Sequence, residues 1–418
     1  MTVLAPHIMT NCERIVDSPL VKQLNSTRYD FGLASVYDYC PFGLFHAVRI
    51  SRYASYSAIP SFIISNLHGG IPELPLYTYT IEDPRINYPK TSIIRRSADI
   101  LQSFILRYFY LRFVDDMDAL FRSRFGTSFP SVGDLASRTA FDFTNGHPIL
   151  DEARPTSHKI KAVGGIATRK PKALEKRFDD FLNLRNGTVL FSFGTMVPAT
   201  AIPEAVVEAF VSAFKMFPDV TFLWKLEGRS FAAADNVITV DWLPQTDLLY
   251  DPRVVGIISH MGMNSFTEAC HSGTPVIALP LQVDQFYNAR RAATLGIAVQ
   301  LSKTNLTTQA ITSALKEFFT DSGLKQRSKT LASMVAEWPE RSERTFIESI
   351  EFAARHEGLH AHLTPVGSQH SLFVQHGYDA FLFLISTVIC LVLTFYISIS
   401  KIFHVTKSIL RVTKAKVE

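Results

Sequence analysis

The sequence predicts an α/β protein with parallel, doubly wound sheets that ends in a membrane-spanning helix. Three observations predict this class. Between residues 187 and 301, short β-rich apolar runs alternate with helical segments, which is typical of βαβ units. A less regular mixture of strand and helix signals precedes residue 169. Near the C-terminus, residues 380–400 carry no charge over about 30 Å of helix, the thickness of the hydrocarbon core of a bilayer.

The individual elements follow from apolar runs and helical spacing. Strands are expected at residues 31–36, 188–193, 220–226, 237–240, 254–258 and 275–279. Helices are expected at residues 203–217, 244–250, 263–271, 284–295, 308–319, 324–338 and 342–356, and a long amphipathic region covers residues 97–125. Ligands of such sheets bind where strands end and helices begin.

Length and composition fit a well-packed protein of two domains. The chain has 418 residues, of which 47% are hydrophobic and 12% aromatic, so disorder is not expected to dominate. The net charge of +4 lies in the tail after residue 400, where five Lys or Arg residues accompany one acidic residue. The rest of the chain is neutral. This balance argues against a nucleic-acid-binding protein, which carries a basic excess on its folded part.

The four cysteines predict neither a metal site nor a disulfide. Cys12, Cys40 and Cys270 are far apart in sequence, and Cys390 lies in the uncharged segment. None has the CxxC or Cys/His spacing of a metal site. We therefore expect buried free thiols and no bound metal.

The uncharged segment indicates a single-pass protein whose folded part is lumenal. The basic tail is expected to stay cytosolic by the positive-inside rule. Sequons at Asn25, Asn186 and Asn305 agree with a lumenal, glycosylated chain. Lys414 and Lys416 form a KxKxx pattern like that of endoplasmic-reticulum retrieval signals, although a basic stop-transfer flank explains them equally. The N-terminus lacks the apolar run of a signal peptide, so either targeting differs or the usual start lies upstream.

A predicted strand-to-helix turn carries the groups that a nucleotide diphosphate needs. His260, Gly262, Asn264 and Ser265 lie in this turn. Free backbone N–H groups and the helix dipole attract phosphate there, and glycine permits close approach. The asparagine and serine add neutral donors, and the histidine can donate a hydrogen bond or carry positive charge.

Neighbouring residues complete a nucleotide-sugar site. Glu268 can accept hydrogen bonds from two ribose hydroxyls. Trp242 offers a flat face to a base, and Asp284 and Gln285 follow a strand end where they can hold sugar hydroxyls. Each residue alone also has a structural explanation, such as a core tryptophan or a helix-capping aspartate. Their combination at these spacings favours a binding site.

These stretches resemble the signature of the UDP-glycosyltransferase family, whose animal members include the UDP-glucuronosyltransferases. The resemblance is densest over residues 242–288, with Trp-Leu-Pro-Gln from 242, Ser-His-Met-Gly-Met-Asn-Ser from 259 and Val-Asp-Gln-Phe-Tyr-Asn from 283. Asn145-Gly-His-Pro and Val163-Gly-Gly-Ile resemble the linker region of the family, and Ser192-Phe-Gly-Thr resembles its loop near the diphosphate. Met261 stands where animal members usually have glycine, but its amide remains and little loss is expected.

The resemblance implies the GT-B architecture, in which two Rossmann-like domains face each other across a cleft. The N-terminal domain would be truncated. The implied divisions are an acceptor-binding domain at residues 1–168, a linker at 169–186, a UDP-sugar-binding domain with trailing helices at 187–356, a juxtamembrane segment at 357–379, the transmembrane helix at 380–400 and a basic cytosolic tail at 401–418.

The resemblance also implies a role for each residue of the donor site. The base would stack on Trp242 with contacts from Gln245, Glu268 would bind ribose, and Asp284 and Gln285 would bind the sugar. Diphosphate contacts would come from Ser192, Thr195, His260, Gly262, Asn264 and Ser265. No cofactor is implied, because the UDP-sugar is the donor substrate.

The catalytic residues of the family are only partly matched. The resemblance implies transfer with inversion, with a histidine near the mature N-terminus as the base and an aspartate that orients it. Nothing matches the segment of that histidine, so the resemblance implies that about a hundred residues of the first domain are absent. Aligning Cys40 with the cysteine of the family puts Ser35 at the acidic position, which leaves Asp38 as the candidate replacement. His7 and His46 have no motif and are not expected to be bases.

Two functions follow from this reading. The first is a membrane-bound enzyme that transfers glucuronic acid or glucose from a UDP-sugar to a small lipophilic acceptor, with the aromatic region at residues 97–125 lining an apolar pocket. The second is a non-catalytic UDP-sugar-binding or regulatory partner that pairs with full-length relatives. Residues that bind UDP are common to both, and the two differ in whether the chain transfers sugar.

Overall fold

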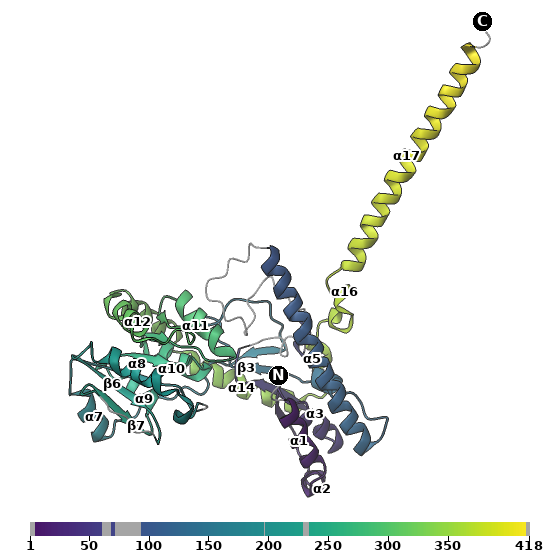
Figure 1. Ribbon diagram of the computed structural model, residues 1–418. Helices are drawn as coiled ribbons and strands as arrows, with labels where there is room; N and C mark the ends of the chain where they lie inside the picture. Colours follow the sequence, from purple (N-terminus) through teal and green to yellow (C-terminus); the bar gives the residue numbers. More distant parts are fainter. Residues whose placement is uncertain (1–4, 61–67, 72–92, 196, 229–233, 415–418) are drawn as a thin grey trace. The chain divides into compact units, whose positions relative to one another are not determined.

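Two parallel sheets organise Met1–Thr364, the larger of the two units into which the chain divides (Figure 1). The computed structural model describes residues 5–60, 68–71, 93–195, 197–228 and 234–414. All strand pairs in the two sheets are parallel, as the alternation of strands and helices predicts.

The first sheet has the strand order β1-β2-β3-β4. Its strands are β1 (Gly32–Ser35), β2 (Tyr53–Ser57), β3 (Asp142–Thr144) and β4 (Ile160–Ala162). The helices that accompany it are α1 (Ala5–Val16), α2 (Pro19–Ser26), α3 (Cys40–Ala47), α5 (Ile93–Phe125) and α6 (Val132–Ser137). Fully buried Tyr39, Phe42 and Phe121 are part of the core that these helices share with β1. The strand expected at residues 31–36 corresponds to β1, and the amphipathic region at 97–125 corresponds to α5.

A disulfide joins α1 to the start of α3, so the prediction of free thiols at these two positions is wrong. Cys12 and Cys40 are bonded, with 5.7 Å between their Cα atoms. Both side chains are about 1% exposed and lie in the core of the first sheet. Cys270 is a buried free thiol, as predicted, whereas Cys390 is a free but exposed one. The sequence separation of 28 residues gave no sign that the fold brings this pair together.

The second sheet has the strand order β10-β9-β8-β5-β6-β7. Its strands are β5 (Gly187–Ser192), β6 (Val220–Lys225), β7 (Val237–Val240), β8 (Val254–Ser259), β9 (Val276–Ala278) and β10 (Ala298–Gln300). Its helices are α8 (Glu204–Phe214), α9 (Gln245–Leu249), α10 (Met263–Ser272), α11 (Asp284–Thr294), α12 (Thr308–Thr320) and α13 (Leu324–Val335). The short 3₁₀ helix η1 (Ala199–Ala201) precedes α8.

The second sheet is buried on both faces, as a doubly wound sheet requires. Successive residues of a strand point to opposite faces. Val189 and Phe191 of β5 accordingly lie in one apolar cluster with α8 and α12. Leu190, between them, lies in a second cluster with α10 and α11. These strands therefore read as continuous apolar runs.

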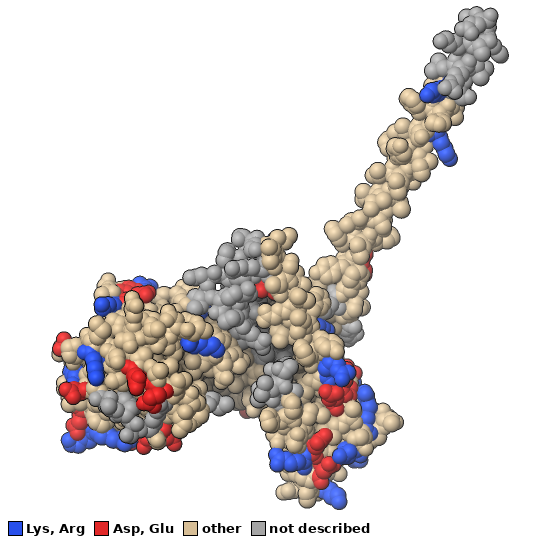
Figure 2. All heavy atoms as spheres, in the orientation of Figure 1, with Lys and Arg blue, Asp and Glu red and all other residues tan. Residues whose placement is uncertain are grey.

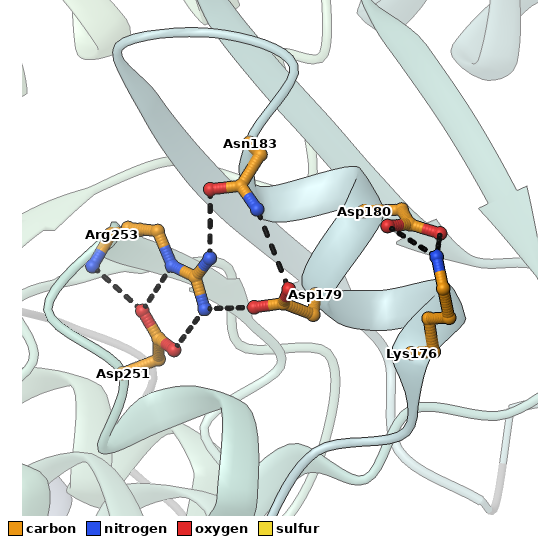
Figure 3. Close-up of polar contacts among 6 residues, drawn as sticks. All are labelled: Lys176, Asp179, Asp180, Asn183, Asp251 and Arg253. Carbon is orange, nitrogen blue, oxygen red and sulfur yellow. Dashed lines mark hydrogen bonds and ion pairs between the residues drawn. The ribbon is translucent and has the colours of Figure 1, made fainter.

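The segment expected to be a linker contains a helix that packs on the second sheet. Phe178 and Leu182 of α7 (Lys176–Leu182) are buried in its core. Figure 3 shows how Arg253, just before β8, ties α7 down through Asp179 at 2.8 Å and Asn183 at 2.9 Å. Asp251 accepts further hydrogen bonds from the same guanidinium. Residues 176–182 thus belong structurally to the second sheet.

The two halves of the large unit exchange segments. Phe346 of α14 (Trp338–Arg355) packs on Phe143 of β3, with 4.7 Å between ring centroids, although α14 follows the second sheet in sequence. In the other direction, Leu150 is buried in the core of the second sheet, and Arg291 donates to its carbonyl oxygen at 2.6 Å. Each half therefore contributes a side chain to the core of the other half.

The smaller unit, Pro365–Glu418, contains one long apolar helix. A short α15 (His360–Leu363) ends the large unit, and η2 (Val366–Gln369) and α16 (Leu372–Gln375) precede α17 (Tyr378–Lys414). Its stretch Tyr378–Lys407 is long and apolar enough to cross a membrane, with a mean hydropathy of 2.6. Figure 2 shows the middle of α17 without charged side chains. The helix continues past residue 400, so much of the expected tail is helical.

Removing the Cys12–Cys40 bond should lower the stability of the first sheet. The bond closes a loop of 28 residues, and releasing a loop of this size stabilises the unfolded chain, through its entropy, by about 3.6 kcal/mol at 25 °C. The Cys12→Ala/Cys40→Ala variant should unfold at a lower urea concentration than the oxidised protein. A thiol reductant should shift the oxidised protein toward the variant and leave the variant unchanged. Equal midpoints with and without reductant would show that the bond contributes nothing.

Candidate nucleotide-sugar site

One open cavity of about 740 Å³ lies at the carboxyl ends of the strands of the second sheet. Its volume is within the range of small-ligand sites. All eleven residues that the sequence assigned to the donor line it: Ser192, Thr195, Trp242, Gln245, His260, Gly262, Asn264, Ser265, Glu268, Asp284 and Gln285. The structure thus brings them to one place. What they bind remains a prediction.

The turn from β8 to α10 forms the floor of this cavity. Met261 adopts a left-handed backbone conformation with a φ of 65°, and its side chain is fully buried. Ser259 Oγ accepts a hydrogen bond from the Met261 amide at 3.1 Å. Gly262 precedes α10, and it lines the cavity together with Met263, Asn264 and Ser265 of the first turn. The N-terminus of α10 therefore faces the cavity, where its dipole favours an anion.

Two glycines leave room for the imidazole of His260. A Cβ atom at Gly262 would lie 2.5 Å from His260 Nε2, and one at Gly194 would lie 2.6 Å from His260 Cε1. The sequence explained glycine here by close approach to phosphate, and the structure adds close approach to this ring. Burial lowers the pKa of His260 and nearby Lys225 lowers it further, whereas a hydrogen bond to the Ser192 backbone opposes the shift. The ring is therefore mostly neutral at pH 7.

The carboxylate of Glu268 is held in place by α9. Thr246 Oγ1 donates to Glu268 Oε1 at 2.8 Å, and Gln245 Nε2 donates to Glu268 Oε2 at 2.5 Å. Gln245 Nε2 also donates to Ser265 Oγ at 3.1 Å. These bonds use the NH₂ group of Gln245, so its carbonyl oxygen stays available. Each Glu268 oxygen also keeps a lone pair for a hydroxyl.

The start of α11 presents Asp284 and Gln285 at another wall. Gln285 Oε1 accepts the amides of Leu281 and Gln282 at 2.8 and 3.0 Å, which leaves its NH₂ group to face a ligand. Burial raises the pKa of Asp284, whereas hydrogen bonds from its own amide, from Asn288 and from the Met263 amide oppose the shift. Asn288 Nδ2 donates hydrogen bonds to Asp284 Oδ2 at 3.0 Å and to the Met261 carbonyl oxygen at 2.9 Å. These bonds connect the wall formed by the start of α11 to the turn that forms the floor.

Lys225 is a cavity residue that the sequence reasoning missed. Its ammonium lies 4.5 Å from the centroid of the Trp242 ring and donates to the Gly194 carbonyl oxygen at 3.1 Å. It ends β6, and ligands of parallel sheets bind at strand ends, so that rule could have found it. Trp242 is 59% exposed and is not a core residue. The remaining lining residues that the prediction lacked are Ala58, Ile59, Arg169, Gly194, Leu243, Pro244, Thr246, Met263, Gln282 and Val283.

Comparison with known proteins decides the family. The profile of the family described as "UDP-glucoronosyl and UDP-glucosyl transferase" matches residues 3–415. The chain belongs to this family. The match extends over both sheets and α17, so it does not rest on the signature alone.

The relatives within the family include glucosyl- and glucuronosyltransferases. UDP-glucosyltransferase 2 of Dactylopius coccus is 30% identical over 266 residues, which are 63% of this chain and 51% of that protein. UDP-glucuronosyltransferase 1A3 of Homo sapiens is 29% identical over 387 residues, 90% of this chain and 70% of that protein. The chain thus spans about half the length of the first relative and 70% of the length of the second.

Solved structures support the GT-B fold of this UDP-glycosyltransferase-family chain. The glycotransferase of kitacinnamycin superposes with a TM-score of 0.57 at 16% identity, covering 82% of this chain and 81% of that one. Spinosyn forosaminyltransferase SpnP gives 0.56 at 14% identity, covering 82% and 80%. At these identities the likeness concerns the fold alone, and it confirms the predicted architecture of two α/β domains.

The residues considered for catalysis lie outside the cavity of this family member. Asp38 accepts a hydrogen bond from the Cys40 amide at 2.9 Å at the start of α3, and burial raises its pKa. The His46 ring packs edge-on against that of Phe129, with 5.1 Å between centroids, and His7 is exposed on α1. Among the described residues of the first half, Ala58 and Ile59 line the cavity. Asp38, His7 and His46 are not among its lining residues.

The left-handed conformation of Met261 gives a test by comparison of two variants. Met261→Ala and Met261→Gly both remove a buried side chain, which costs about 2–5 kcal/mol. A left-handed residue with a Cβ atom carries about 1–2 kcal/mol of strain that glycine lacks. Met261→Gly should therefore unfold at a higher urea concentration than Met261→Ala. At an unstrained position glycine would be the less stable of the two by about 0.5–1 kcal/mol, so the opposite order would refute the strain.

Proposed function

We propose that this chain binds a UDP-sugar in the 740 Å³ cavity and transfers the sugar, glucuronic acid or glucose, to an acceptor. The observation that carries the proposal is the convergence of the eleven signature residues on one cavity in a chain of this family. Each part of the donor has a chemically matched wall.

The donor would lie across the cavity from Trp242 to α11. The exposed Trp242 ring would stack on uracil, and the free carbonyl oxygen of Gln245 would accept an N–H of the base. Glu268 would accept the ribose hydroxyls. The diphosphate would meet the N-terminus of α10 and the Lys225 ammonium, which adds the positive charge that neutral His260 does not supply. Asp284 and the NH₂ group of Gln285 would hold the sugar.

We further propose that the acceptor is a small lipophilic molecule and that the protein is anchored in the endoplasmic-reticulum membrane. The first half contributes apolar Ala58 and Ile59 to the cavity, which favours an apolar acceptor beside the sugar. Residues 380–400, within the apolar stretch Tyr378–Lys407, would form the anchor, with the basic tail after them cytosolic and the sheets lumenal. Exposed side chains at Asn25, Asn186 and Asn305 agree with glycosylation in that compartment.

Binding and transfer are separate claims and are tested separately. Transfer requires a base that takes the proton of the acceptor hydroxyl. The three residues considered for this role, Asp38, His7 and His46, are not among the described residues that line the cavity. The full chain in detergent should bind UDP and release UDP from UDP-glucuronic acid or UDP-glucose when a phenolic acceptor is added. Binding without release would refute transfer and favour the UDP-sugar-binding partner.

Glu268→Ala should weaken UDP binding by about 1–3 kcal/mol, because it removes a half-buried acceptor from the ribose hydroxyls. Titration calorimetry with UDP measures the change. Glu351→Ala, on the exposed side of α14 and outside the cavity, is the matched control and should bind UDP like the unaltered chain. An unchanged affinity in Glu268→Ala would remove Glu268 from the ribose site.

A further inference from the structure

Asn145 connects the first sheet directly to the predicted diphosphate site. It follows β3, and its amide donates to the Ser57 carbonyl oxygen at 2.9 Å at the end of β2. Its side-chain Nδ2 donates to the Ala58 carbonyl oxygen at 3.0 Å and to Asn264 Oδ1 at 3.3 Å. Asn264 belongs to the first turn of α10 and lines the cavity.

These two bonds fix which way both side-chain amides face. The Ala58 carbonyl oxygen can only accept, so Asn145 must turn its NH₂ group toward it. The same NH₂ group faces Asn264, which must therefore present its oxygen to Asn145. The NH₂ group of Asn264 is then left for the cavity, where it can donate to a phosphate oxygen. Without Asn145 the two ends of the Asn264 amide would compete for that position.

The loop that carries Asn145 is held tightly. Gly164 donates its amide to the Gly146 carbonyl oxygen at 2.8 Å. A Cβ atom at Gly164 would lie 2.5 Å from that oxygen, and one at Gly146 would lie 2.7 Å from Asp151 Oδ2. The close approach of these backbones leaves the residue before Gly146 little freedom. Asn145 is thus preset by the first half of the protein before a ligand arrives.

We infer that Asn145 is a positioning residue for the diphosphate of the donor, acting through the Asn264 amide. The inference rests on the proposed function and adds a residue from the opposite half of the protein to the donor site. Its consequence is that the first half, which also forms the Ala58–Ile59 wall, contributes to diphosphate affinity without touching the nucleotide. The affinity for the nucleoside alone does not depend on Asn145.

The test compares UDP with uridine on the full chain in detergent, by calorimetry for UDP and ligand-observed NMR for uridine. Asn145→Ala should weaken UDP binding about five- to tenfold, the effect of one hydrogen bond, and leave uridine binding unchanged. Asn145→Asp, of the same shape, only accepts hydrogen bonds, so it should turn the Asn264 oxygen toward the phosphate and weaken UDP binding at least as much. If the alanine variant does not fold, the comparison of UDP with uridine is made on Asn145→Asp alone. Asn183→Ala, in the ionic cluster of Figure 3, is the control and should match the unaltered chain.

A double-mutant cycle separates positioning from a general structural effect. In an Asn264→Ala background, Asn145→Ala should cause no further loss of UDP affinity, because the group it orients is gone. Additive losses, or equal losses for UDP and uridine, would overturn the inference and leave the proposed function intact. An unaltered chain that binds UDP no better than uridine would overturn the proposed function and the inference with it.

Discussion

The chain must leave β8, turn into α10 and direct the start of that helix at the cavity, all within the four residues from Ser259 to Gly262. It does so by placing Met261 in a left-handed conformation and burying its side chain beneath the turn. Burial of the side chain offsets the cost of the strained backbone. His260 and Gly262 then face the cavity from either side of Met261. The proposed contacts of His260 and the start of α10 with the diphosphate depend on this turn.

The neighbouring helices α9 and α11 form hydrogen bonds with α10 or with the turn that precedes it. Asn288 of α11 donates to the Met261 carbonyl oxygen and to Asp284, so the sugar wall is positioned relative to the floor. Glu268, on α10, is fixed by Gln245 and Thr246, so the base and ribose walls follow the same helix. Asn145 adds a bond from the first sheet. The site is thus preorganised before the donor binds, which reduces the entropy lost on binding.

The sequence predicted the second sheet and its cavity well because both follow from local patterns. Apolar runs and helical spacing gave the helices and every strand except β10 within a few residues, and parallel strands bring their carboxyl ends to one edge. Lys225 obeys the same rule and was missed only because no signature motif includes it. The Cys12–Cys40 bond could not be predicted, since it depends on how α1 and α3 pack within the first half. The crossing of α14 to the first sheet and the Asn145–Asn264 contact could not be predicted either, since both depend on how the two halves pack together.

A structure of the full chain with UDP bound tests the central claim most directly. The account predicts the uracil ring against Trp242, the ribose hydroxyls within hydrogen-bond distance of Glu268, and the diphosphate at the N-terminus of α10 beside Asn264 and Lys225. The Met261 turn should keep its left-handed conformation. A diphosphate bound away from α10, or a turn that rearranges to admit the nucleotide, would contradict the account of a preformed site.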